Sequence, residues 1–331
     1  MAFAKVVSQV SPSMAVLGVT GPVAGTDDLL TTGSPIKFTP RMDFVDLRTH
    51  STSFTKRTGI VTSRLWDISA EYYMMGNGTN GTAVTNGITS IKALLAMAAM
   101  TGTVGGATVT YAPSTITAAG GSATGKGIIW GENNGLLHKG TACVGNVVLV
   151  GTPTDGWKAN WTGVGIYAEP TLETIGGSWG TGLSNTAKAF LSTQGTIGIA
   201  GTNYTPVISR AEFNRGVVTG RVSDTNAATG INEVFPRDAS PTLTLSIGMD
   251  TTASSSTQLS AVTMYNHFTA NTTHSVNYQT GTTAGNIWKL TCPKAQLRNI
   301  RYEEGDGYML MRLEYNVTHS GENTEFTLVH W

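Results

Sequence analysis

The sequence predicts a mainly β protein, and three observations lead to this fold class. Forty glycines stand among many Thr, Ser and Asn residues, a composition typical of short strands joined by turns. Apolar and polar residues alternate over several segments, most clearly from Met309 to Thr318. Only two or three segments have the composition and capping residues of a helix.

Length and charge narrow the classes of protein. The 331 residues suffice for two ordinary domains. Charged residues make up only 13%, and the 21 basic and 21 acidic residues cancel. This balance argues against the basic surface that tight nucleic-acid binding requires. A low charge also leaves little electrostatic repulsion between copies of the chain, which favours self-association into an assembly.

The cysteines and apolar runs indicate a soluble protein made in the cytoplasm. Cys143 and Cys292 form no disulfide framework and lack metal-ligand spacing, so we expect two buried free thiols in a reducing compartment. The longest apolar run, Ala93–Met100, is far shorter than a membrane span. The apolar stretch near the start is interrupted by Ser, Gln and Pro, and we expect no signal peptide.

Helices are predicted at three places. Residues 89–101 have a Thr or Ser cap, strong helix formers, and Gly102 as a stop. Residues 255–269 follow a serine cap, and 185–193 is a shorter candidate. Strands are predicted over most of the rest, at 35–47, 58–75, 107–112, 127–131, 205–213, 216–223, 242–249, 286–291 and 325–331.

The two sides of a glycine-rich segment are alike, which predicts a tandem duplication. We expect domains at 1–175 and 191–331, joined by a linker at 176–190. Each half has a strand, a helix, and strands leading to a cysteine. An Asp-Gly turn and an amphipathic strand then close each half. Cys143 and Cys292 therefore occupy equivalent places and should not be bonded to each other.

The closing hairpins should have one dry and one wet face. In the second half the residues expected to pack in the core are Met309, Met311, Leu313 and Tyr315. Those expected on the wet face are Arg312, Glu314, Asn316 and Thr318. In the first half the corresponding wet face would hold Lys158, Asn160 and Thr162.

Two short motifs lie in contexts that do not suit their chemistry. GGSATGKG (120–127) nearly fits a phosphate loop, but Gly127 stands where a hydroxyl should bind magnesium, and a strand follows instead of a helix. GGSWG (176–180) fits the nucleophile-elbow pattern around Ser178, but it lies in the expected linker. Neither motif predicts a reaction.

The titratable residues likewise predict no catalytic, cofactor-binding or metal-binding site. The acidic group Glu303, Glu304 and Asp306 lacks the pattern of a calcium loop and is typical of a solvated hairpin tip. The histidines show no metal-ligand spacing: His50, His138, His267, His274, His319 and His330. We therefore expect a protein that is not an enzyme.

Four stretches, in this order, resemble the major tail tube proteins of long-tailed bacteriophages, specifically the longer two-domain type. They are VTGPVAGTDDLLTTGSPIKFTPRMDFVDLR (19–48), GTACVGNVVLVGTPTDGWKANWTGVGIYAEP (140–170), residues 205–250 from TPVISRAEF to LSIGMD, and residues 292–331 from CPKAQLRNI to FTLVHW. The Thr/Gly/Ser segment at 113–126 is longer than the family pattern.

The resemblance implies two tandem tail-tube-like β-barrel or sandwich domains, each with a flanking helix and a long hairpin. It implies rings that stack into the conduit for DNA ejection, located in the virion and assembled in the host cytoplasm. With two tube-like halves, we expect trimeric pseudo-hexameric rings, with a hexamer as the alternative. Expected partners are the chain itself, the tape measure protein, the tail terminator and distal tail proteins, and DNA that passes without specific binding; no membrane is expected.

Other classes remain open from the sequence alone. A secretion-system tube protein shares the fold but normally has one domain and about half this length. A β-rich decoration or binding module of a virion or cell surface is a further alternative. An enzyme comes last, because neither motif lies in a workable context.

Overall fold

The structure is a computed structural model of the full chain. It describes residues 6–11, 36–45, 60–74, 89–106, 108–114, 126–133, 136–153, 156–172, 193–199, 202–248, 259–281, 285, 287–305, 308–319, 321 and 323–331. The predicted linker at 176–190, the GGSWG motif and His50 lie outside these residues.

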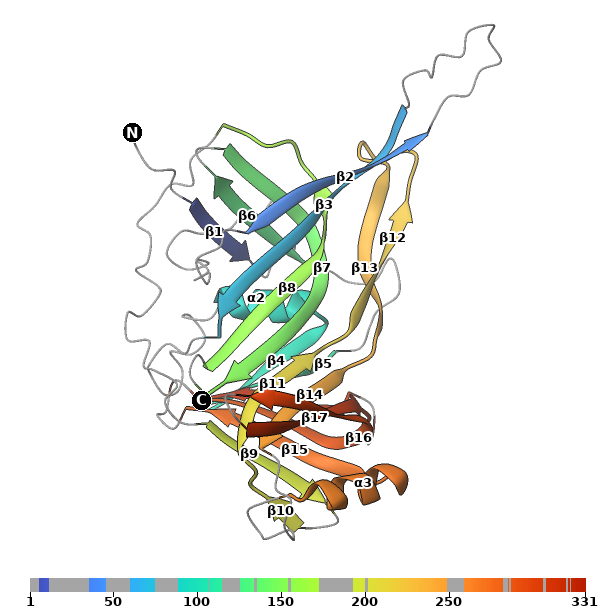
Figure 1. Ribbon diagram of the computed structural model, residues 1–331. Coiled ribbons are helices and arrows are strands. Elements are labelled where there is room, and N and C mark those ends of the chain that lie inside the picture. The colour runs from blue at the N-terminus through green and yellow to red at the C-terminus, as the bar shows by residue number, and fades with distance from the viewer. Residues whose placement is uncertain are drawn as a thin grey trace, which may run out of the picture.

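The described chain is mainly β, as predicted (Figure 1). Most strands belong to one 16-stranded sheet, and β12 and β13 form a separate pair. The first-half strands are β1 (Val6–Ser11), β2 (Lys37–Val45), β3 (Ile60–Tyr73), β4 (Met100–Gly105), β5 (Thr108–Pro113), β6 (Gly127–Asn133), β7 (Leu136–Thr152) and β8 (Gly156–Tyr167). The second-half strands are β9 (Thr193–Ile199), β10 (Thr202–Tyr204), β11 (Ile208–Asn214), β12 (Val217–Ser223), β13 (Ile231–Ala239), β14 (Thr242–Gly248), β15 (Thr273–Thr280), β16 (Trp288–Gly305), β17 (Tyr308–Val317) and β18 (Thr327–His330).

The two described helices are shorter than predicted. Helix α2 (Thr89–Met97) ends before Gly102, because Ala99 takes a positive φ of 54° and buried Met100 begins β4. Helix α3 (Ala261–Thr269) begins after Ser260, whose hydroxyl accepts a hydrogen bond from the Thr263 N–H. The candidate at 185–193 lies outside the described residues except for Thr193, which begins a strand.

The two halves repeat the same order of antiparallel strands. In the first half the neighbours run β1-β6-β7-β8-β3-β2. In the second they run β9-β15-β16-β17-β14-β11. Each helix follows the equivalent strand, α2 after β3 and α3 after β14. Cys143 and Cys292 lie in the equivalent strands β7 and β16, and both are free and buried. This order supports the predicted duplication.

One part of the expected fold, the closed barrel, is not found among the described residues. The strand pairings among the described residues form an open sheet, so neither half closes into a barrel by itself. The path ends at β2 on one side and at β10 on the other. The expected barrel would therefore need edges from other chains.

The halves share one hydrophobic core. A single cluster of buried side chains includes Trp157 and Trp161 from the first half and Trp288 and Tyr315 from the second. The division into 1–175 and 191–331 stays a prediction. The shared core nevertheless means that each half buries apolar surface against the other.

The predicted faces of the closing hairpins are confirmed with one exception. Met311, Leu313 and Tyr315 are buried, whereas Arg312, Glu314, Asn316 and Thr318 are partly exposed. Met309 is 46% exposed, so its predicted place in the core is wrong. The reason is that β14 ends at Gly248 opposite Leu310, which leaves Met309 with a described strand on one side only.

We predict that Gly163→Ala destabilises the protein. Gly163 lies opposite Gly145, and a Cβ at position 163 would come 2.5 Å from the Trp161 ring and 2.6 Å from the Gly145 Cα. Crowding at such a site costs about 1–3 kcal/mol of the free energy of unfolding, which urea titration would measure. Gly105→Ala is the control, because its new Cβ would meet nothing closer than 3.8 Å. Equal stability of both variants would contradict the prediction.

Candidate assembly surfaces

The first of two described strand pairings that join the halves is formed by β11 and β7. Residues 211–214 of β11 pair with residues 148–151 of β7. Phe213 lies opposite Leu149 on one side and Leu243 on the other, and its ring is 4.6 Å from that of Phe326. All four side chains are fully buried. The pairing is therefore held by a dry contact as well as by backbone hydrogen bonds.

The second pairing joins β18 to β5. His330 lies opposite Val109 of the first half and Trp288 of the second, with its ring 4.5 Å from the Trp288 ring. His330 is fully buried, and burial lowers its pKa from 6.5 to about 4. The neutral imidazole is thus the form that fits this joint.

A polar cluster turns the chain where β11 ends. Asn146 donates to the Asn214 side chain (2.8 Å) and accepts from the Val217 N–H (3.0 Å). The Asn214 side chain also accepts from the Gly216 N–H (2.8 Å). Gly216 has a φ of +69°, and a side chain there would strike the Ser240 backbone, so only glycine fits this bend. The bend sends β12 and β13 away from the second-half sheet.

The hairpin β12–β13 lies against the first half (Figure 1). Ile231 and Val234 of β13 pack on Leu65, Val144 and Val164 in a small separate core. The hairpin is also tied by an Arg221–Asp43 ion pair of 2.9 Å and an ion pair between Lys126 and Glu233. The second half therefore covers one end of the first-half sheet.

The edges of β2 and β16 are among the strand edges of the repeated sheets that carry no partner strand in the described part of the chain. Strand β2 pairs only with β3. Residues 297–305 of β16 pair with β17 on one edge, and β15 leaves the opposite edge at Gln296. In the first half, the edge of β7 that lies beyond β6 carries β11. The equivalent edge of β16 is the open one.

The registers of the two halves identify which residues are equivalent at these edges. Phe38 pairs with Ile68 as Phe213 pairs with Leu243, which places Phe38 in the position of Phe213. Tyr302 pairs with Met311 as Leu149 pairs with Ala159, so Tyr302 takes the position of Leu149. Tyr302 is 46% exposed, whereas Leu149 is fully covered by the second half.

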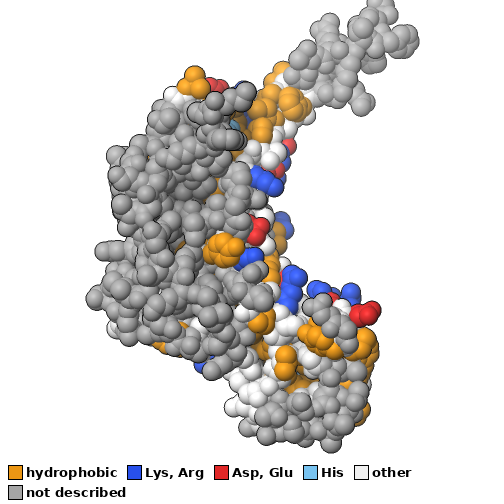
Figure 2. Space-filling model, turned by 60° about the vertical axis from the view of Figure 1, so that its left-hand side comes forward, with side chains coloured by type: hydrophobic (Ala, Val, Ile, Leu, Met, Phe, Trp, Pro, Cys, Tyr) orange, Lys and Arg blue, Asp and Glu red, His pale blue; other side chains and the backbone are white. Residues whose placement is uncertain are grey.

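We use the name polar wall for one face of the strands β2, β3, β8, β7, β11, β14, β17 and β16. Their registers bring alternate residues of each strand onto this face, opposite the shared core. Its charged members include Lys37, Arg41, Asp43, Asp67, Glu71, Lys158, Arg210, Glu212, Arg301, Glu303, Arg312 and Glu314. In Figure 2, basic and acidic side chains gather along the hollowed side of the molecule.

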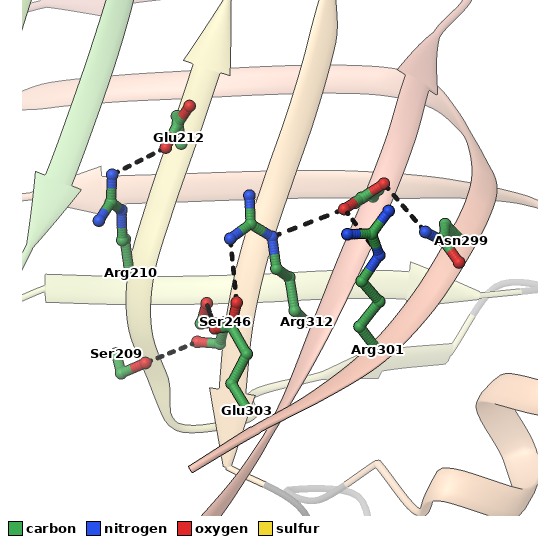
Figure 3. Close-up of polar contacts among 9 residues, drawn as sticks. Ser209, Arg210, Glu212, Ser246, Asn299, Arg301, Glu303 and Arg312 are labelled. Atoms are coloured by element: carbon green, nitrogen blue, oxygen red, sulfur yellow. Dashed lines mark hydrogen bonds and ion pairs between the residues drawn. The ribbon is translucent and has the colours of Figure 1, made fainter. Parts of the chain in front are cut away.

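Ion pairs neutralise much of the wall (Figure 3). Arg312 donates to Glu303 at 2.9 Å, and this hydrogen bond lowers the pKa of Glu303 and raises that of Arg312. Glu314 Oε1 lies 3.6 Å from Arg301 and 3.7 Å from Arg312. Arg210 pairs with Glu212 at 2.8 Å. The wall therefore carries many charges but little net charge.

The structure places some of the remaining sequence candidates. Lys126 of the phosphate-loop-like motif is ion-paired with Glu233, and Gly127 begins a strand, as expected. Glu303 belongs to the ion pairs of the wall, and Asp306 lies outside the described residues. No group of three or more His, Cys, Asp or Glu side chains that could hold a metal ion occurs in the described part of the chain. Neither described helix is long and apolar enough to cross a membrane.

The strand at 205–213 was predicted from the sequence, but its pairing with the first half and the Arg215 beside it were not. Arg215 is 2% exposed and lies over the Phe326 ring at 5.4 Å. Its backbone N–H donates to Val147, directly beyond the β7–β11 pairing. The phenylalanine shared by the equivalent strands, Phe38 and Phe213, indicates that the two strands correspond, but it does not show which strand β11 pairs with.

We predict that Phe213→Ala weakens the contact between the halves. Removing a fully buried phenylalanine costs about 3–5 kcal/mol of the free energy of unfolding, because a cavity remains. Phe44→Ala is the matched control, since Phe44 is 62% exposed and should change stability little. Urea titration of the unassembled variants would measure both, and a small effect of Phe213→Ala would contradict this account of the joint.

We predict that mild acid destabilises the joint at His330. The folded-state pKa lies below the unfolded value of 6.5, so the stabilisation is complete above that pH and is lost as the pH falls toward about 4. The slope in this window is up to about 1.4 kcal/mol per pH unit for one histidine. His330→Leu should unfold with a shallower pH dependence than the natural chain between pH 7 and 5. An unchanged slope in urea titrations would show that His330 does not titrate on unfolding.

No protein-family model matches the chain, and no curated protein sequence matches it. The open strand edges and the polar wall are therefore the features of the molecule that bear on its function.

Proposed function

We propose that this chain is a structural virion protein that joins edge to edge into rings, and that the rings stack into the tail tube of a long-tailed bacteriophage. The observation that carries the proposal is the β7–β11 pairing, in which one repeat adds its first wall strand to the last wall strand of the other. The same step, repeated between chains, would place β2 of one copy on the open edge of β16 of the next.

This contact is head-to-tail. The two surfaces differ, so each added copy presents a fresh β16 edge, and the series ends only when a ring closes. A closed ring leaves no unpaired wall edge, which removes the tendency of exposed strands to aggregate. The internal pairing thus supports an assembly in which every joint has similar geometry.

The side chains at the proposed contact are complementary. By the repeat, Phe38 would face Tyr302, as Phe213 faces Leu149 within the chain. Lys37 would face Glu303, in the positions that Glu212 and Val150 occupy at the internal joint. Aromatic pairs and opposite charges on directly facing positions both stabilise antiparallel strands.

The width of the wall favours three copies. At about 4.8 Å per strand, three walls give a perimeter of roughly 115 Å and a ring about 37 Å across, which strand tilt widens further. Two copies would give about 24 Å, which side chains would largely fill. Three copies leave room for a DNA double helix, whereas six would leave a far wider bore. We therefore propose a trimeric ring whose lumen passes DNA.

We predict that a cysteine pair across the proposed joint forms disulfides between chains. Lys37→Cys with Glu303→Cys would place two thiols opposite each other, within bonding reach for facing strand residues. Mild oxidation of assembled protein should give covalent species up to the trimer on a non-reducing gel. The natural thiols, Cys143 and Cys292, are buried and should contribute little background.

A control variant carries Glu71→Cys with Glu303→Cys. Glu71 belongs to the same wall but lies on β3, one strand in from the edge, so no cross-link is expected. Cross-linked species up to the hexamer would show that a ring contains six copies instead of three, and they would still support the edge contact. Absence of cross-links from both variants would overturn the edge contact. Negative-stain images of the unmodified protein test the tube itself, since hollow stacked rings are expected.

A further inference from the structure

We propose that Glu303 and Glu314 mask the arginines of the polar wall from nucleic-acid phosphates, so that the wall can border duplex DNA without holding it. This proposal rests on the proposed function, because it treats the polar wall as the surface that faces the lumen. The opposite face is occupied by the shared core and cannot be that surface.

Two arginines at the centre of the masked region face each other. Arg301 of β16 lies directly opposite Arg312 of β17. Like charges in facing positions repel, and a guanidinium is the group best shaped to bind a phosphate with two hydrogen bonds. Unmasked, this pair would be a ready phosphate site on the wall.

Glu303 and Glu314 both contact this pair, and Figure 3 shows Glu303 beside Arg312. Glu303 accepts from Arg312 at 2.9 Å, and Glu314 lies within 3.7 Å of both guanidiniums. The second oxygen of each carboxylate is also held: Ser246 donates to Glu303 and Asn299 donates to Glu314, each at 3.2 Å. Neighbouring strands therefore fix both carboxylates over the arginines.

The other arginines of the wall are paired in the same way. Arg41 pairs with Asp67 at 3.0 Å, and Arg210 pairs with Glu212 at 2.8 Å. Lys158 lies over the Tyr73 ring at 5.4 Å from its centroid. Each arginine that the described registers place on the wall is thus paired with a carboxylate of the same wall. This pairing of arginines with carboxylates occurs in both halves, so it is a property of the whole wall and not of one site.

The ion pairs reduce the free energy that is gained when an arginine of the wall binds a DNA phosphate. DNA binding draws its affinity from lysines and arginines that replace condensed counterions. An arginine that is already neutralised by a carboxylate must give up that carboxylate when it binds a phosphate. The exchange therefore yields little binding free energy. A ring presents several copies of the wall, so unpaired arginines in every copy would bind the DNA together and hold it strongly.

The test compares two double variants of the full chain with the same change in net charge. Glu303→Gln with Glu314→Gln removes the masking carboxylates and keeps their shape. Glu169→Gln with Glu304→Gln removes two carboxylates elsewhere; Glu169 is 81% exposed and lies 4.0 Å from Arg64, off the wall. The probe is a fluorescent linear DNA duplex, and anisotropy at several salt concentrations gives the affinity.

We expect the natural chain and the control to bind the duplex equally weakly. The masking variant should bind at least tenfold tighter, and its log–log salt slope should steepen by about 1.8 for two further phosphate contacts. Equal affinity of all three proteins, or equal gains for both variants, would overturn the proposal. Glu314→Gln alone is measured too, because Glu314 lies on β17, away from the proposed joint, and should show part of the gain.

Negative-stain images of the same samples separate this proposal from the proposed function. Tubes from the natural chain without a gain in DNA binding by the masking variant would reject masking and keep the tube. A gain in binding without tubes from any sample would support masking and reject the tube.

Discussion

The pairing of β11 with β7 is the constraint on which the rest of the structure depends. It converts two similar sheets into one continuous wall and gives that wall a direction, because the last strand of one repeat carries the first strand of the next. The shared core, the bend at Gly216 and the cover of β12–β13 all surround this joint. A different junction would leave the same strands without a common face.

The periodic patterns predicted much of this architecture. Alternation located the closing hairpins and their faces, since a strand with one buried face has a fixed inside and outside. Met309 was assigned to the core because the pattern continues to it, but alternation does not show where a neighbouring strand ends. Both helices were placed, yet their ends were not, because Ala99 at a positive φ ends α2 before any glycine.

The sequence pattern did not predict which strands from distant segments pair with each other. Nothing in residues 208–214 shows that they pair with residues 148–151, because strand partners are chosen by tertiary packing. The wall as a candidate surface arises only from that pairing. Individual charges were visible in the sequence, but the opposition of Arg301 and Arg312, and the carboxylates that compensate it, depend on register.

The β12–β13 hairpin has a consequence for how a ring could come together. It holds the internal joint before any second chain arrives, so each copy enters assembly with one of its joints already made. In the proposed trimer only every other joint lies between chains, so three chains assemble in two association steps, whereas six single-repeat chains would need five. The loss of translational and rotational entropy is therefore incurred fewer times. In the proposed assembly the two kinds of joint can also differ: the internal one is dry, while the outer one can stay polar enough for the free chain to remain dissolved.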